Sequence, residues 1–163
     1  MDLSLTNGAP IAKINLKTSS MYLVEVAEVT IGDVIFIEQN VALLDTGNTL
    51  ICLPMDSYDS FLKYFNDKGI DCKLIPESNP MFSQLSCSFK DMEDVPDFSV
   101  VLDGVKFVIK KDELIDNCSR TFFVFGSYEC LLVIEFQQGG YQEVILGQNF
   151  LAHTYTSFFL EKN

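Results

Sequence analysis

Positive charge and histidine are scarce in this chain. It carries 11 lysines and arginines against 23 aspartates and glutamates in 163 residues, a formal net charge of −12. Nucleic acids and anionic membrane surfaces are bound by basic patches, so this balance argues against both as partners. His153 is the one histidine and Arg120 the one arginine. Chemistry that needs several imidazoles, such as a zinc site of three histidines, is therefore excluded.

Long apolar runs and phosphate-binding loops are also absent. No run approaches the roughly 18 apolar residues of a membrane span, and neither G-x-x-x-x-G-K-[ST] nor G-x-G-x-x-G occurs. The first residues, MDLSLTNG, have neither a basic region nor an apolar core, so we expect no secretory leader at this end. The sequence thus predicts no membrane span, and no metal or other cofactor is expected.

Cysteine spacing argues against a further class of site. No C-x-x-C pair occurs, so a zinc ribbon is not expected. The five cysteines are Cys52, Cys72, Cys87, Cys118 and Cys130. Because five is odd, at most two bridges form within the chain and one thiol remains. Asn117-Cys118-Ser119 also matches the acceptor pattern for N-glycosylation, a pattern short enough to arise often by chance.

The residues that are present suffice for a β-rich domain. Hydrophobic residues make up 48% of the chain, and a domain of this length buries roughly 68–70% of its unfolded surface. Short β-prone runs are separated by turn residues, so we expect a single domain over residues 1–163. The expected strands are Ile11–Leu16, Tyr22–Ile31, Val34–Gln39, Val41–Leu44, Leu50–Leu53, Phe98–Leu102, Val105–Ile109, Thr121–Phe125, Leu131–Phe136, Val144–Leu146 and Thr154–Phe159.

One segment has the pattern of a helix. Apolar residues recur at helical spacing between Met55 and Phe65, and Gly69 follows as a terminator. Residues 71–83, which include two prolines, are expected to form a surface loop around one strand.

The most informative stretch is VALLDTGNTLI, residues 41–51. Asp45 stands at the end of an apolar strand, where a carboxylate is costly unless turn N–H groups or a hydroxyl stabilise it. Gly47 lets backbone N–H groups come close to this carboxylate or to a ligand. The tripeptide D-T-G alone is weak evidence, because Asp and Gly are ordinary turn residues. Its position between two apolar strands makes Asp45 a candidate catalytic residue.

Four features of the sequence occur in a recognisable order. They are D-T-G at residues 45–47, a helix after Pro54, Val-Pro-Asp-Phe at 95–98 and VILGQNFL at 144–151. In this order they resemble the C-terminal lobe of the pepsin-like aspartic proteases, from about Tyr22 to Phe159. The resemblance implies an all-β fold with one or two short helices, the C-terminal lobe of the bilobal acid protease fold. It also implies an aspartic-type endopeptidase that acts on polypeptides and is secreted or vacuolar or lysosomal.

The resemblance assigns roles to individual residues. Asp45 is expected to supply one half of a carboxylate dyad that activates water for peptide-bond hydrolysis, without a covalent intermediate. The residues expected to line the substrate cleft are Gly47, Asn48 and Thr49. Thr46 and Gly147 are expected to support the site, and Gly147 would let a neighbouring strand pass close to the D-T-G loop.

The resemblance also bears on the cysteines. It implies a disulfide between Cys87 and Cys118, and Cys72 with Cys130 is a second candidate pair. Cys52, inside the strand that follows the motif, is interpreted as a buried free thiol rather than a nucleophile.

Two departures from the family pattern leave the function open. Asn48 stands where the family has a Ser or Thr that hydrogen-bonds the catalytic carboxylate; an amide can donate instead, but with a longer reach. There is one D-T-G and no candidate for the other lobe, whose absence would leave the isolated lobe inactive. The chain is therefore either the C-terminal part of a two-lobed enzyme or an inactive binding, inhibitor or scaffolding module. A homodimer with two copies of Asp45 is a further alternative.

Overall fold

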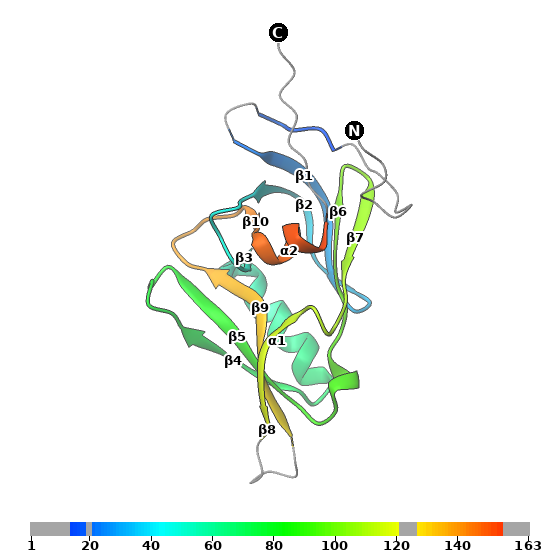
Figure 1. The fold of residues 1–163 in the computed structure, drawn as a ribbon, viewed down its shortest axis with the longest axis vertical. Helices are drawn as coiled ribbons and strands as arrows, with labels where there is room; N and C mark the ends of the chain where they lie inside the picture. The colour runs from blue at the N-terminus through cyan, green and yellow to red at the C-terminus, as the bar shows by residue number, and fades with distance from the viewer. Residues whose placement is uncertain (1–13, 19–20, 121–126, 155–163) are drawn as a thin grey trace.

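The computed structural model describes residues 14–18, 21–120 and 127–154 (Figure 1). In chain order the elements are β1 (Leu23–Ile31), β2 (Val34–Leu44), β3 (Ile51–Pro54), η2 (Met55–Ser57), α1 (Tyr58–Asp67), β4 (Asp71–Pro76), β5 (Phe82–Phe89), η3 (Met92–Asp94), β6 (Phe98–Leu102), β7 (Val105–Ile109), β8 (Ile115–Arg120), β9 (Tyr128–Gln137), β10 (Val144–Leu146) and α2 (Gln148–His153). The all-β fold with one or two short helices is confirmed.

The strands form one mixed sheet. Their order is β4-β5-β9-β3-β10-β2-β1-β6-β7, and β8 pairs with β9 beside this path. Strand β10 lies between β2 and β3, parallel to β2 and antiparallel to β3. The chain that joins β2 to β3 must therefore cross the end of β10. Residues 45–50 consequently lie against the residues that follow β10, although the two segments are about a hundred residues apart in the sequence.

Aromatic rings join the helices to the sheet. The Phe61 ring of α1 lies 5.1 Å from that of Phe36 on β2 and 5.4 Å from that of Phe136 on β9. The Phe107 ring of β7 lies 5.7 Å from that of Phe150 on α2. Phe61 and Phe136 are fully buried, and aromatic side chains contribute strongly to core packing. In the described ranges, no helix has the length and apolar character to cross a membrane.

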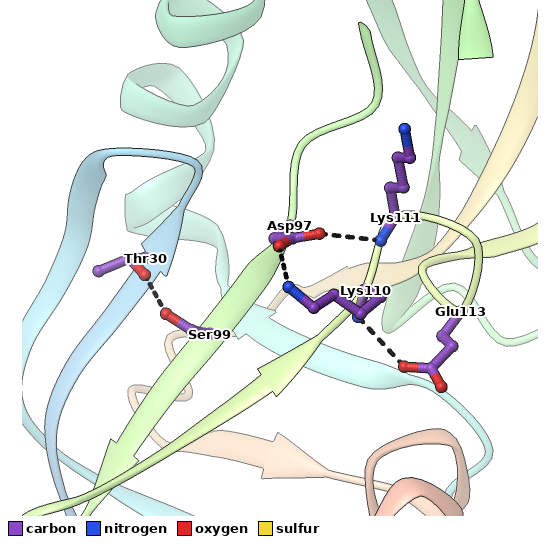
Figure 2. A network of polar contacts seen from close by, with 6 residues as sticks. All are labelled: Thr30, Asp97, Ser99, Lys110, Lys111 and Glu113. Atoms are coloured by element: carbon purple, nitrogen blue, oxygen red, sulfur yellow. Dashed lines mark hydrogen bonds and ion pairs between the residues drawn. The ribbon is translucent and has the colours of Figure 1, made fainter. Parts of the chain in front are cut away.

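Polar contacts hold the open end of the hairpin β6–β7 together and join the hairpin to β1 (Figure 2). Asp97, just before β6, accepts a hydrogen bond from Lys110 Nζ at 2.7 Å and from the Lys111 backbone N–H at 3.1 Å. The hydroxyls of Thr30 on β1 and Ser99 on β6 hydrogen-bond each other in the buried sheet. The Val-Pro-Asp stretch thus joins the start of β6 to the residues that follow β7.

Most expected strands are present. Tyr22–Ile31 is β1, and Val34–Gln39 continues through Val41–Leu44 to form the single strand β2. The expected hairpin is β6–β7, and the helix is α1, preceded by η2. The expected strands at 121–125 and 154–159 lie outside the described residues apart from Thr154, which directly follows α2. Of the first expected strand, Leu16 forms an isolated bridge with Val24.

The prediction for residues 71–83, a surface loop around one strand, missed one of the two strands there. This segment forms β4 and the beginning of β5, an antiparallel pair in which Asp71 faces Ser88 and Pro76 faces Ser83. Strand β8 was also missed. Strands β5 and β8 contain many polar residues and β4 ends at Pro76, so their own sequence carries little β signal. Pairing supplies what the local pattern lacks, β4 with β5, and β5 and β8 with β9.

The predicted disulfide between Cys87 and Cys118 is replaced by two different bridges. Cys72 is bonded to Cys87, and Cys118 to Cys130. The physical reason is the strand register: each bonded pair faces directly across neighbouring strands, β4 with β5 and β8 with β9. Cys87 and Cys118 lie on strands that flank β9, so β9 separates them, and β5 likewise separates Cys72 from Cys130. Cys52 is a buried free thiol, as expected.

Candidate active site

The D-T-G turn leaves β2 at its last residue and reaches β3 across the end of β10. Asp45 follows the buried Leu44, and its backbone N–H donates to the Leu146 carbonyl of β10 at 3.1 Å. The Gly47 N–H donates to Asp45 Oδ1 at 2.8 Å, and the Asn48 N–H to the Asp45 carbonyl at 3.4 Å. The turn therefore supplies the Asp45 carboxylate with one amide hydrogen bond, from Gly47, which offsets part of the cost of a charge beside a buried residue.

Gly147 lies directly against this turn. A Cβ at position 147 would stand 2.3 Å from the Leu50 carbonyl oxygen and 2.7 Å from that of Asn48. The Gly147 N–H donates to the Leu50 carbonyl at 3.2 Å. Because both obstructing atoms belong to the backbone, only a residue without a side chain leaves room for this approach.

The residues after Gly147 complete the contact. The Gln148 N–H donates to the Asn48 carbonyl at 2.8 Å, and the Asn149 N–H to the Thr49 carbonyl at 3.0 Å. The Gln148 side chain also donates from Nε2 to the Thr46 carbonyl at 2.7 Å. The side-chain amide of Gln148 therefore helps to hold the D-T-G turn.

The Asn48 side chain points away from the candidate catalytic carboxylate and into the sheet. Its Nδ2 donates to Cys52 Sγ at 3.0 Å and to Glu135 Oε1 at 3.3 Å, while its Oδ1 accepts the Leu50 N–H at 2.8 Å. The Cys52 thiol donates to the same Glu135 oxygen at 2.5 Å. Asn48, Cys52 and Glu135 thus form a hydrogen-bonded cluster, which we call the Asn48 cluster, beneath the D-T-G turn.

Burial and neighbouring carboxylates shift the protonation of this region. Burial, followed by the hydrogen bond to Glu135, raises the pKa of the Cys52 thiol far above its usual range, so the thiol stays protonated. Burial also raises the pKa of Glu77, and the nearby Glu135 raises it further by repulsion and by a hydrogen bond. Glu135 is only 4% exposed. No described cation forms an ion pair with either glutamate.

An open cavity of about 390 Å³ lies beside the turn. It is lined by Gly47, Asn48, Thr49, Leu50, Glu77, Asn79, Phe82, Gln84, Asp116 and Glu135. The lining comes from the D-T-G turn and the residues that follow it, from the β4–β5 hairpin, and from strands β8 and β9. Within the described ranges, no group of three or more His, Cys, Asp or Glu side chains is placed to hold a metal ion.

The predicted site residues fall into two groups in space. Asp45, Thr46, Gly47, Asn48 and Thr49 are contiguous, and the backbone contacts above bring Gly147 against them. The two cysteines named with them, in contrast, lie in the β4-β5-β9-β8 part of the sheet. Sequence reasoning missed Glu135, although a glutamate inside the apolar run 131–136 was a signal that could have been used, because an ionisable group in a buried strand needs a partner.

A comparison with protein families accounts for this arrangement. The sequence matches the model of the eukaryotic aspartyl proteases over residues 1–163. The chain therefore belongs to the eukaryotic aspartyl protease family, as its motifs predicted. A search among curated protein sequences found no match. The family supports a general protease function and a polypeptide substrate.

Proposed function

We propose that this chain is the C-terminal lobe of a two-lobed acid endopeptidase in which Asp45 supplies one of the two catalytic carboxylates. The observation that carries the proposal is the position of Asp45. It follows the buried Leu44 at the end of β2, receives the Gly47 N–H on its carboxylate at 2.8 Å, and borders an open cavity through the next residues of the turn. Membership of the aspartyl protease family supports this assignment.

The chemistry requires two carboxylates that share a proton and a water molecule, an arrangement well known in aspartic proteases. One carboxylate removes a proton from the water, and the other donates a proton to the oxygen of the scissile carbonyl. The protonation states belong to the pair and not to Asp45 alone. The second carboxylate would come from an N-terminal lobe, so the isolated chain is expected to be inactive.

The substrate is an extended polypeptide. Gly47, Asn48 and Thr49 line the cavity. The Gly47 carbonyl and the Thr49 N–H, which no described residue hydrogen-bonds, would pair with the backbone of a bound peptide as a neighbouring strand does. Gly147 and Thr46 act indirectly, by keeping the turn against β10.

The proposed location is outside the cell or in a vacuole or lysosome. Members of this family are typically found in those places. The two disulfides support the same location, because such bonds persist in oxidising compartments and are rare in the cytosol.

One observation favours a second candidate, an inactive binding module. Asn48 directs its amide to Cys52 and Glu135, so it does not supply Asp45 with the hydrogen bond that the family's Ser or Thr supplies. A binding module would keep the fold and the cavity without needing a catalytic carboxylate.

The two candidates are separated by replacing Asp45 in the complete protein. The Asp45→Asn variant should lose proteolysis at acid pH by at least about a hundredfold, the usual contribution of a general acid or base, while its unfolding temperature changes little. A peptide mimic with a hydroxyl at the scissile position should inhibit the unsubstituted protein. Asp33→Asn, in the exposed β1–β2 turn, is the matched control and should remain active. Unchanged activity in Asp45→Asn would refute the catalytic proposal, and no activity in the complete protein would favour the binding module.

A further inference from the structure

One motif of the sequence has no part in the proposed reaction. Asn117-Cys118-Ser119 is the only Asn-x-Ser/Thr triplet in the chain, and it lies in the middle of β8. Such a triplet is the acceptor pattern for an N-linked oligosaccharide, a bulky and hydrophilic group that requires a surface position. The structure allows this requirement to be examined at each residue of the triplet.

The surroundings of Asn117 meet that requirement. Asn117 and Ser119 are both exposed, and no described residue hydrogen-bonds the Asn117 carboxamide. Strand β8 pairs only with β9 among the described elements, and in Figure 1 it lies at the far end of the molecule from β1 and β2. A glycan on Asn117 would therefore extend from an edge strand without displacing a packed side chain.

In the folded protein, an oligosaccharide-transferring enzyme cannot bind the triplet in β8. Asn117 faces Leu131, Cys118 faces Cys130 and Ser119 faces Glu129, and the Cys118–Cys130 disulfide joins the middle of the triplet to β9. An oligosaccharide-transferring enzyme must hold the asparagine and the serine in its own site. It cannot do so while the triplet is extended, paired and covalently attached to β9.

We propose that Asn117 is an N-glycosylation site and that it is modified before the Cys118–Cys130 disulfide forms. This inference rests on the proposed passage through an oxidising secretory compartment. Because Cys130 follows Cys118 by 12 residues, the triplet emerges first during synthesis and is briefly without its partner strand. Once the disulfide has formed, the oligosaccharide can no longer be transferred to Asn117.

The two steps compete for the same segment. In the first, Asn117 Nδ2 forms a bond to the anomeric carbon of an oligosaccharide carried on a lipid pyrophosphate. The bond from that carbon to the pyrophosphate oxygen breaks, the lipid pyrophosphate leaves, and the amide proton passes to a base. In the second, a disulfide-bearing oxidoreductase accepts two electrons and two protons from the thiols of Cys118 and Cys130.

A glycan here would also protect the sheet. An exposed edge strand presents unpaired backbone groups with which another chain can pair. A hydrophilic group attached to β8 would block that pairing. Asp116, the preceding residue, lines the cavity beside the D-T-G turn, so the glycan would lie close to the proposed substrate site without occupying it.

The test is to express the complete protein in eukaryotic cells and measure the occupancy of Asn117 by mass spectrometry. Peptide N-glycosidase converts a glycosylated asparagine to aspartate, which identifies the site directly. We expect a mobility shift that this enzyme removes, and loss of the shift in both Asn117→Gln and Ser119→Ala. Cys130→Ser leaves the triplet intact but prevents the disulfide, so occupancy should rise above that of the unsubstituted protein.

A reference site distinguishes the possible failures. Lys68→Thr completes a second acceptor triplet at the exposed Asn66, and this triplet contains no cysteine. Glycosylation at Asn66 with none at Asn117, in both the Lys68→Thr protein and its Cys130→Ser combination, would overturn the proposed site. Equal occupancy of Asn117 with and without Cys130 would overturn the proposed order. An absence of sugar at both sites would overturn the proposal together with the secretory location, while the activity test of Asp45 would be unaffected.

Discussion

Gly147 is the residue whose replacement tests the packing of the candidate site most directly. Gly147→Ala would place a Cβ within 2.7 Å of two backbone carbonyl oxygens, which cannot move without displacing the D-T-G turn. We expect a loss of unfolding free energy of about 1–3 kcal/mol, as for other overpacked sites, and reduced proteolysis in the complete protein. Urea denaturation would measure the first effect.

Gly104→Ala provides the control for this experiment. Gly104 has a φ of +78° and no atom near its Cβ position, so alanine there should cost only the backbone strain of about 1 kcal/mol. If Gly147→Ala were no more destabilising than Gly104→Ala, the close approach of the turn to β10 would be in doubt.

The second prediction at this scale concerns Glu77. Its pKa is raised by burial and by Glu135. Between the pKa of the unfolded state and that of the folded state, Glu77 is therefore protonated in the folded protein and ionised in the unfolded chain. This contribution to stability is fully present below the unfolded pKa and is lost as pH rises through the folded pKa. Glutamine cannot ionise, so Glu77→Gln avoids the cost of a partly buried negative charge beside Glu135. The variant should therefore be more stable than the unsubstituted protein at neutral pH. The gain should shrink at acid pH, which urea titrations at several pH values would measure. A gain of the same size at every pH, or no gain at neutral pH, would contradict the interpretation.

At the scale of elements, Asp97 connects the start of β6 to the residues that follow β7. The hydrogen bond from Lys110, helped by the Lys111 backbone N–H, lowers the pKa of Asp97. Stability from this contact is therefore present above the unfolded pKa and lost as pH falls through the folded pKa. Asp97→Asn should lower stability near neutral pH by less than about 1 kcal/mol, because the Lys110–Asp97 pair is largely exposed.

The measurement is thermal or urea unfolding as a function of pH. The difference between Asp97→Asn and the unsubstituted protein should decrease toward low pH. Asp112→Asn is the nearby control, since no described residue hydrogen-bonds or ion-pairs with Asp112, and it should change stability less. A larger effect in Asp112→Asn would show that general charge, and not the β6–β7 connection, determines the result.

The elements also differ in how far they could be predicted. The hairpins β1–β2 and β6–β7 have apolar strands and Gly-Asp or Asp-Gly turns, so local sequence identifies both the strands and their pairing. Strands β4 and β8 are short; β4 ends at a proline and β8 is rich in polar residues. They are strands because β5 and β9 offer them backbone partners, and a local pattern contains no information about a distant partner.

At the scale of the whole molecule, the disulfide map is the clearest prediction. Digestion without reduction should yield peptides that link Cys72 to Cys87 and Cys118 to Cys130, with Cys52 unmodified until the protein unfolds. Each bridge closes a short loop and should contribute about 3 kcal/mol on the chain-entropy model. The double variant Cys72→Ala/Cys87→Ala should accordingly unfold at a lower urea concentration. A peptide linking Cys87 to Cys118 would contradict the register of the β5, β8 and β9 strands.

The sequence by itself determined the features that depend on neighbours in the chain. The D-T-G turn between two apolar strands, the helix after Pro54 and the strand before Gly147 are local patterns, and together they identified the family. They also identified Asp45 as the candidate catalytic residue, because a carboxylate at the end of an apolar strand is costly wherever that strand is buried.

Only the tertiary structure decided which distant residues meet. The insertion of β10 between β2 and β3 brings Gly147 within reach of the Asn48 and Leu50 carbonyls. Pairing of β3 with β9 brings Cys52 opposite Glu135 and turns the Asn48 amide toward both. Strand order and register likewise determine the disulfide partner of each bonded cysteine. Cross-strand contacts depend on the alignment of segments far apart in the chain, and a shift of one residue turns every side chain to the other face.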